Sequence, residues 1–260
     1  MSRVEMVKVV SNIQVADDMW QMELAAAEMA AACKPGQFVH IRVSDSIDPL
    51  LRRPLSVYDI EQERLHLLYK VVGQGTRLLT RLVSNDYVDI MGPLGQGFTL
   101  PGKKSYVLLV GGGVGMAPLV YLARRLKAMD CRVTALYGVE NKEQLAAADR
   151  LTKLGANCQP ATMDGSAGYQ GIVTGLLQEV LEKEIPDYIY TCGPEVMMAK
   201  VAGLAQQYKI PGQVSLEESM ACGVGACLGC ARKLKHDSDG YVKVCKDGPV
   251  FDFEQIDFGK

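Results

Sequence analysis

The chain has 260 residues, 48% of them hydrophobic and 22% charged, a composition typical of a globular protein with a sizeable core. Its formal net charge of -2 leaves no basic field that would hold nucleic acid or an anionic membrane surface. The N-terminus lacks a signal-peptide pattern, and no apolar run approaches the ~20 residues that span a bilayer. We therefore expect a cytoplasmic protein of about two domains that binds neither nucleic acid nor membrane.

The first hundred residues predict a β-barrel. Short runs of apolar and β-branched residues alternate there with turns that contain Gly and Pro. Four runs are assigned as strands: 4–10, 37–43, 65–72 and 87–91. Many short strands at regular spacing favour a closed barrel, and the stretch 76–83 predicts one short helix.

The pattern changes after a Pro-Gly-Lys-Lys linker at 101–104. The next predicted strands are 106–110, 131–137, 157–163, 188–191 and 213–216, and the predicted helices are 118–129, 142–154, 172–181 and 194–208. Alternating strands and helices predict a parallel sheet with helices on both faces. From residue 217 onward the chain is rich in Gly and Cys and has little periodicity. The expected fold is multidomain: a β-barrel at 1–100, an α/β domain at 101–216 and a small module at 217–260.

Four of the eight cysteines gather near the C-terminus, with the spacing Cys222-x4-Cys227-x2-Cys230-x14-Cys245. Disulfides are rare in a cytoplasmic chain, so these cysteines are candidate metal ligands. The spacing is the plant-type pattern that holds a [2Fe–2S] cluster, and the small residues between the ligands let backbone N–H groups approach the sulfurs. A zinc site is the alternative, but zinc sites usually have two short Cys pairs.

Three segments of the predicted barrel have the chemistry of a flavin site. Arg53-Pro54-Leu55-Ser56 offers a planar charged fork for a pyrophosphate and a hydroxyl for the edge of the flavin ring. The first segment resembles the Arg-x-apolar-Ser flavin signature in the barrel of ferredoxin reductases, and this resemblance implies that Leu68-Tyr69-Lys70 would flank the ring and the ribityl chain. Gly75-Thr76 opens the short helix, where backbone N–H groups can bind a phosphate. A lone arginine is more often a surface residue, but here several elements occur in order.

A glycine-rich turn, Gly111-Gly112-Gly113-Val114-Gly115, joins the first strand of the α/β domain to its first helix. Glycines allow a tight turn in which a pyrophosphate can approach the helix N-terminus, and Pro118 suits the first helical turn. A second loop, Cys192-Gly193-Pro194, ends a predicted strand and begins a helix. Cys192 by itself could be an ordinary core residue, but its position at a strand end favours a site.

These motifs, taken in order, resemble the ferredoxin-reductase family over the whole chain. The resemblance is most specific to electron-transfer subunits of dihydroorotate dehydrogenase B, because of Arg-Pro-Leu-Ser, Cys-Gly-Pro, the glycine-rich turn and the segment around the clustered cysteines. It implies FAD in the barrel, NAD on the α/β domain, with the Cys-Gly-Pro loop placing the nicotinamide against the flavin, and a [2Fe–2S] cluster. It also implies a heterotetramer of two such subunits with two FMN-containing catalytic subunits. Leu55 stands where many relatives have Tyr, so stacking on the flavin ring must come from another residue.

Three alternatives share parts of this pattern. The small subunit of an electron-bifurcating ferredoxin:NADP reductase has the same architecture, but that family replaces one cluster cysteine with Asp. A self-contained oxygenase reductase usually appends a longer ferredoxin domain, and a zinc-binding interaction module would bind no flavin. The turn after the second strand contains Glu140 and no arginine, which favours NAD over NADP because a 2′-phosphate needs cationic partners.

Overall fold

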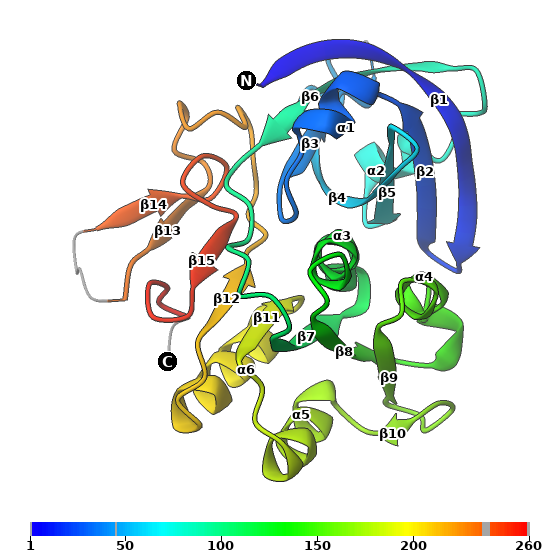
Figure 1. Cartoon of the computed structure of the whole chain (residues 1–260). Helices are drawn as coiled ribbons and strands as arrows, with labels where there is room; N and C mark the ends of the chain where they lie inside the picture. The colour runs from blue at the N-terminus through cyan, green and yellow to red at the C-terminus, as the bar shows by residue number, and fades with distance from the viewer. Residues whose placement is uncertain (1, 45, 236–239, 259–260) are drawn as a thin grey trace.

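The computed structural model describes residues 2–44, 46–235 and 240–258, and its N-terminal part is a closed antiparallel barrel (Figure 1). The strands follow the order β1-β2-β5-β4-β3-β6 around the barrel. Their bounds are β1 Arg3–Ala16, β2 Met19–Ala25, β3 Phe38–Ile41, β4 Arg53–Glu61, β5 Arg64–Lys70 and β6 Tyr87–Leu94, with α1 at Ala27–Ala32 and α2 at Gln74–Leu79. Alternate residues along each strand fill the barrel, as Val7 and Val9 do in β1, because successive side chains of a strand point to opposite faces.

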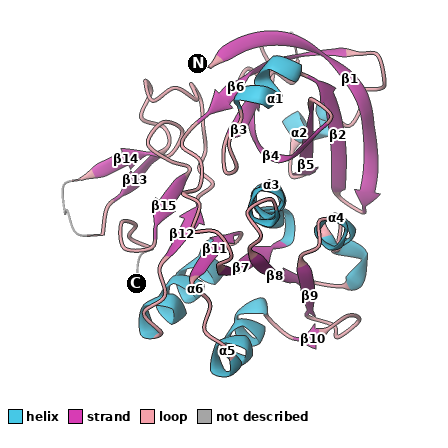
Figure 2. Cartoon of the chain, in the orientation of Figure 1, coloured by secondary structure: helices cyan, strands magenta, loops and turns pink. Residues whose placement is uncertain are grey.

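The second part is a sheet with the strand order β10-β9-β8-β7-β11-β12-β15. Its strands are β7 Tyr106–Gly112, β8 Arg132–Val139, β9 Asn157–Thr162, β10 Tyr169–Gln170, β11 Tyr188–Cys192, β12 Gly212–Ser215 and β15 Val250–Asp252. Its helices are α3 Ala117–Lys127, α4 Ala148–Lys153, α5 Val173–Lys183 and α6 Glu195–Gln207, with short 3-10 turns η1 at Gly113–Met116 and η2 at Lys142–Gln144. The strands pair in parallel except for β12 and β15. Figure 2 shows α3 and α4 on the side of the sheet that faces the barrel, and α5 and α6 on the other.

Helix α3 lies between the sheet and the barrel (Figure 1) and packs against both. The Tyr121 ring joins the barrel core, and its hydroxyl donates a hydrogen bond to the backbone oxygen of Cys33 at 3.2 Å. The other face of α3 is buried against the sheet through residues such as Leu122 and Leu126. The barrel and the sheet therefore share one packed helix.

The C-terminal residues return to the sheet. After the cysteine-rich loop, β13 (Ala231–Lys233) and β14 (Tyr241–Lys243) form a two-stranded sheet, and β15 then pairs antiparallel with β12 at the edge of the large sheet. Cys230 and Cys245 are buried in the same core as Phe38 of the barrel. The small module is therefore held against both other parts of the molecule. No helix in the described residues is long and apolar enough to cross a membrane.

The structure contains elements that the sequence did not predict, namely β2, β4, β10, β13, β14, β15 and α1, and it divides one predicted helix. Two of these differences have plain physical reasons. Residues Met19–Ala25 form β2, although no strand is predicted there, because Met22 and Leu24 complete the barrel core. The helix predicted at 142–154 divides into η2 and α4. Tertiary hydrogen bonds fix the turn between them: Gln144 Oε1 accepts from the Glu140 N–H at 3.2 Å, and the Gln144 backbone oxygen accepts from the Tyr137 hydroxyl at 3.3 Å.

Candidate functional site

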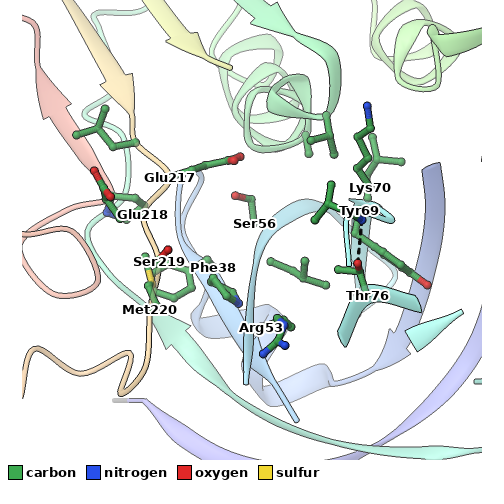
Figure 3. A pocket seen from close by; sticks show the side chains of 18 residues that line it. Phe38, Arg53, Ser56, Tyr69, Lys70, Thr76, Glu217, Glu218, Ser219 and Met220 are labelled. Atoms are coloured by element: carbon green, nitrogen blue, oxygen red, sulfur yellow. Dashed lines mark hydrogen bonds between the residues drawn. The ribbon is translucent and has the colours of Figure 1, made fainter. Parts of the chain in front are cut away.

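A cavity of about 480 Å³ lies where the barrel, the α/β sheet and the C-terminal segment meet (Figure 3). Residues from three barrel elements, β4, β5 and α2, line one side of it: Arg53, Pro54, Leu55, Ser56, Leu68, Tyr69, Lys70 and Thr76. The side chain of Leu55 belongs to the barrel core, whereas its neighbour Ser56 faces the cavity (Figure 3). The predicted barrel segments thus converge on one cavity.

The guanidinium group of Arg53 lies over the start of α2. It donates a hydrogen bond to the backbone oxygen of Leu51 at 2.5 Å. A Cβ atom on Gly75 would lie 2.4 Å from Arg53 Nε, so only glycine leaves room for the guanidinium there. Gly75 itself does not line the cavity. The Thr76 hydroxyl accepts hydrogen bonds from the N–H groups of Val72 and Gly73, at 3.0 and 3.2 Å, and so holds the turn that shapes the cavity wall.

The side chain of Tyr69 points into the barrel. Its hydroxyl donates a hydrogen bond to Asn12 Oδ1 at 3.0 Å, and burial raises its pKa to about 12. Leu68, on the opposite face of β5, packs on the core that includes Ala117 of α3. At these two positions the cavity wall is therefore formed largely by strand β5 itself. The next residue, Lys70, adds a charged side chain to the wall.

A second cavity, of about 760 Å³, opens at the carboxyl ends of the parallel strands. Both predicted loops of the α/β domain line it, through Gly112, Gly113, Gly115, Gly193 and Pro194. A Cβ atom on Gly115 would lie 2.6 Å from the backbone oxygen of Cys192, so the two loops are in direct contact. Crevices at the carboxyl ends of strands in open α/β sheets are the usual places for nucleotides.

The remaining predicted residues of these loops act from behind the cavity wall. Gly111 packs against Met116, and Pro118 is buried in the first turn of α3. The thiol of Cys192 is fully buried in the core, and burial raises its pKa well above the ordinary value. Cys192 lines neither cavity, so its contact with the site is through the backbone next to Gly115.

The two cavities adjoin. Lys70, Val114 and Glu217 line both of them. Figure 3 shows the Glu217 carboxyl group reaching into the first cavity. Its side chain is exposed within this opening, but the surrounding protein restricts its hydration and raises its pKa. A ligand of each cavity would meet the other at this junction.

The sequence motifs did not reveal the other wall, which β3 and the C-terminal segment form. Phe38, Glu217, Glu218, Ser219 and Met220 line the first cavity (Figure 3). Phe38 gives this wall an aromatic side chain. Met220 is separated from Cys222 by a single residue, so the cavity wall leads directly into the cysteine-rich loop.

The loop from Cys222 to Cys230 wraps its backbone around the sulfurs. Cys222 Sγ accepts hydrogen bonds from the N–H groups of Val224, Ala226 and Cys227, at 3.5, 3.3 and 3.4 Å. Backbone N–H groups also donate to the other three sulfurs. Gly225 donates to Cys245 Sγ at 3.1 Å, Gly229 to Cys227 Sγ at 3.4 Å and Cys245 to Cys230 Sγ at 3.4 Å. Such donors stabilise negative charge on sulfur, as a thiolate-bound metal requires.

The side chain of Cys222 interacts with Cys227 and that of Cys245 with Cys230, while Cys222 also acts on Cys245 through its charge. The backbone N–H groups of Val224 and Cys227 lower the pKa of Cys222 to about 6, whereas burial raises the pKa of Cys245 to about 12. Within the described residues no three His, Cys, Asp or Glu side chains converge at single-ion spacing. A two-iron cluster takes two protein ligands on each iron, which fits thiols in two pairs.

Arg232 connects the cysteine-rich module to the α/β domain and to the wall of the first cavity. It forms an ion pair with Glu195 at the start of α6, directly after the Cys-Gly-Pro loop, and donates to Glu218 Oε1 at 3.1 Å in the wall of the first cavity. Only Ala231 separates it from Cys230 in the sequence. One side chain therefore links the module to the first cavity and to the helix that follows the Cys-Gly-Pro loop.

Two family models match this chain. Residues 217–257 match the iron–sulfur cluster binding domain of dihydroorotate dehydrogenase B, and residues 109–203 match an oxidoreductase NAD-binding domain. The first match disfavours the zinc alternative, and the second covers the glycine-rich turn and the Cys-Gly-Pro loop.

Curated relatives match over nearly the whole length. The electron transfer subunit of dihydroorotate dehydrogenase B (NAD+) from Desulforamulus reducens is 40% identical, over 98% of this chain and 99% of that protein. The subunit of the same name from Clostridium acetobutylicum is also 40% identical, over 94% of this chain and 93% of the other.

Solved structures share the fold. An NADH-dependent reduced ferredoxin-NADP oxidoreductase, described for flavin-based electron bifurcation, superimposes with a TM-score of 0.86 at 30% identity, over 98% of this chain and 90% of its own. A cytochrome P450 reductase from Amycolatopsis superimposes with a TM-score of 0.67 at 23% identity, over 80% of this chain and 67% of its own, which shows the fold alone. The predicted ferredoxin-reductase-like architecture is confirmed. The chain belongs to the family of dihydroorotate dehydrogenase B (NAD+) electron transfer subunits, flavin- and NAD-linked oxidoreductase subunits with an iron–sulfur cluster module.

Proposed function

We propose that this chain carries electrons between NAD, FAD and a [2Fe–2S] cluster within an NAD-linked dihydroorotate dehydrogenase of pyrimidine biosynthesis. Its partner is an FMN-containing catalytic subunit, in a cytoplasmic heterotetramer of two subunits of each kind. In the physiological direction the complex would oxidise dihydroorotate on the partner and reduce NAD+ on this chain. We also propose the division into residues 1–100 for FAD, 101–216 for NAD and 217–260 for the cluster.

The observation that most strongly supports this proposal is the continuity of the three sites. The two cavities share Lys70, Val114 and Glu217, and the wall of the first continues through Met220 to Cys222. When bound, the flavin exchanges hydride with the nicotinamide and single electrons with the cluster, so it must lie between them. The order of sites along the molecule meets that requirement.

The barrel residues fit a flavin dinucleotide. The guanidinium group of Arg53 is a charged fork for the pyrophosphate, and it occupies the space that the missing side chain of Gly75 leaves free. Ser56 presents a hydroxyl for the ring edge, with Pro54 and Leu55 in the same wall. Leu68, Tyr69, Lys70 and Thr76 complete that side. Phe38 and Met220 close the opposite side with apolar surface, as a flat aromatic ring needs.

The second cavity fits a nicotinamide dinucleotide. Gly111, Gly112, Gly113 and Gly115 keep the turn narrow enough for a pyrophosphate, and Pro118 begins the helix behind it. Cys192, Gly193 and Pro194 bring the loop that would hold the nicotinamide toward the junction. Glu217 stands at the junction, where burial raises its pKa and its carboxyl group faces the place at which the two ligands would meet.

Cys222, Cys227, Cys230 and Cys245 would bind the cluster. Their donor set is soft thiolate, and their arrangement in two pairs with backbone N–H donors suits two irons. Because both cavities are assigned to cofactors, we place the oxidation of dihydroorotate on the partner.

The proposal is tested by reconstitution without oxygen. The chain is co-expressed with an FMN-containing dihydroorotate dehydrogenase catalytic subunit, taken from a genome that encodes this chain as well. The purified complex is then supplied with dihydroorotate and NAD+. We expect NADH to form with the complex and not with either subunit alone. A complex that binds all three cofactors but forms no NADH would contradict the proposed function.

A second candidate function is the small subunit of a bifurcating reductase, favoured by the TM-score of 0.86 to such an enzyme. That function requires a partner that acts on ferredoxin and NADP in place of dihydroorotate. The four-cysteine ligand set argues against it, because the bifurcating family replaces one cysteine with Asp. Co-purification of the chain with its native partner separates the two functions.

A further inference from the structure

His40 on strand β3 is completely buried, but neither of its ring nitrogens has a hydrogen-bond partner among the described residues. An imidazole buried without partners is costly, so such a group usually marks a bound water, ion or ligand. The backbone of the same residue is satisfied, because its oxygen accepts a hydrogen bond from Arg52 Nη1 at 3.3 Å. The side chain alone needs an explanation.

The imidazole faces the cysteine-rich loop. Val39 and Ile41 fill the barrel core, so His40 and Phe38 lie on the outer face of β3. Phe38 lines the first cavity. A Cβ atom on Gly223 would lie 2.6 Å from His40 Nδ1, which means that the ring rests against the residue after Cys222. The outer face of one short strand therefore touches both the first cavity and the cysteine-rich loop.

The surroundings of the ring favour its neutral form. Burial lowers the pKa of His40 to about 4 and the nearby Arg52 guanidinium acts in the same direction, whereas a contact with the Arg52 backbone acts against them. A neutral imidazole has one N–H donor and one acceptor nitrogen. It can therefore donate one hydrogen bond without bringing a charge.

The loop already directs its own donors inward. The N–H groups of Val224, Gly225 and Ala226 all point to cysteine sulfurs. These bonds come from the loop backbone, whereas His40 comes from the barrel and contacts the loop at Gly223. A side-chain donor at this place would complement them.

We propose that His40 donates a hydrogen bond from the barrel to a sulfur of the bound cluster, and so both fixes the loop and raises the reduction potential of the cluster. The proposal rests on the proposed function, since it needs the cluster to be bound. A donor to sulfur stabilises the more negative, reduced state. The residue is a positioning residue, because it touches the cluster pocket and no reacting substrate.

The test replaces the ring without removing its bulk. His40→Phe, purified in complex with the catalytic subunit, should retain iron, and its cluster midpoint potential should shift to a lower value. His40→Gln keeps an N–H donor and should recover part of the shift. The matched control is His66→Phe, because His66 is a second buried barrel histidine with an unpartnered Nδ1, on strand β5. That variant should leave the potential unchanged.

A second measurement needs no variant. The wild-type complex is prepared with histidine carrying a heavy nitrogen isotope, and the reduced cluster is examined by pulsed electron paramagnetic resonance. We expect a hyperfine coupling from a labelled histidine nitrogen, and we expect His66→Phe to keep it.

The outcomes are distinct from those of the proposed function. Absence of iron from the wild-type complex would reject the cluster itself. With iron present, the absence of a histidine coupling in the wild type would overturn the proposal, even if His40→Phe did not fold. An unchanged midpoint potential in iron-loaded His40→Phe would overturn it as well.

Discussion

Asp59 and Arg124 form a buried ion pair that joins the barrel to the α/β domain. Asp59, on β4, is fully buried, and its Oδ1 accepts from Arg124 Nε at 2.6 Å. Its Oδ2 accepts from Arg150 Nε of α4, also at 2.6 Å. Glu61 contacts the same two arginines from an exposed position, at 3.5 and 3.0 Å. The strand that carries Ser56 is thereby tied to the helix that follows the glycine-rich turn.

Asp59→Asn should destabilise the protein strongly, because it leaves two arginines beside a buried neutral group. Removal of one partner from a buried ion pair costs about 3–5 kcal/mol, and partial solvation of the arginines places this case near the lower value, about 3 kcal/mol. For a chain of this size that corresponds to a fall in Tm of roughly 6–12 °C, measured by thermal unfolding of the flavin-loaded protein.

Glu61→Gln is the control for this prediction, since it removes a charge from the same cluster at its exposed edge. Exposed pairs contribute about 0–1 kcal/mol, so its Tm should fall by no more than about 4 °C. Equal losses in the two variants would show that the buried carboxylate is not the main connection between the two parts.

Arg53→Ala should weaken FAD binding. The substitution removes a charged hydrogen-bonding fork worth about 1.5–3 kcal/mol, so the Kd for FAD should rise roughly tenfold or more. Titration of the apoprotein with FAD measures this directly. Arg64→Ala, on the exposed end of β5, should bind FAD as the wild type does. An unchanged Kd in Arg53→Ala would remove Arg53 from the flavin site.

Cys227→Ser should abolish cluster binding, because it removes one of two thiolates from an iron. Iron analysis should show the loss, and the long-wavelength visible absorption should disappear while FAD remains bound. Cys158→Ser replaces a cysteine of strand β9, far along the chain from the loop, and should keep full iron content. If all four loop variants kept their iron, the ligand assignment would be wrong.

NADH should reduce the flavin much faster than NADPH. Glu140 lines the second cavity, where its carboxylate would repel a 2′-phosphate, and the cations that line that cavity are Lys70 and Lys200, with no arginine among them. Stopped-flow mixing with each nucleotide gives the two rates. Glu140→Gln should narrow the difference, whereas Glu143→Gln, on exposed η2, should not. Equal rates for NADH and NADPH in the wild type would contradict this prediction.

Local sequence patterns predicted the parts of the molecule that depend on local chemistry. The barrel, the alternating strands and helices, and the glycine-rich turn at 111–115 each have a periodicity or a spacing of their own. Met19–Ala25 has none, and it becomes β2 because the barrel needs Met22 and Leu24 in its core. Here tertiary packing, rather than intrinsic propensity, determines the strand.

For the candidate site, too, the sequence predicted only the residues that have a local motif. The barrel segment that begins at Arg53 was found from its side-chain chemistry, and the structure places it in the first cavity. Phe38 and Glu217 have no motif around them, and they line the cavity only because β3 and the C-terminal segment meet there. The sequence also could not predict that the Tyr69 side chain points into the barrel, where its hydroxyl donates a hydrogen bond to Asn12. Contacts between distant segments carry no local signal.

The last prediction concerns the partner, which we expect to dock over the loop at 222–228. Val224 and Leu228 are exposed apolar side chains there, 49% and 64% accessible, and Cys227 is itself exposed. Exposed apolar side chains beside a redox centre are suited to a protein interface. Gly225 and Ala226 are small, so a bulky substitution at either position could hold the partner further from the loop.

Only Ala226 is suitable for that test. Gly225 has φ +80, and a Cβ atom there would lie 2.7 Å from Lys246 Cδ, so a larger residue would distort the loop that holds the sulfurs. Ala226 is exposed and free of this constraint. Ala226→Trp should keep its iron and its rate of flavin reduction by NADH, but electron transfer from dihydroorotate to NAD+ in the complex should slow severalfold, because tunnelling falls steeply with separation. Ala128→Trp, at an exposed site beyond α3, is the control and should leave both rates unchanged. Unimpaired transfer in Ala226→Trp would show that electrons leave the chain by another face.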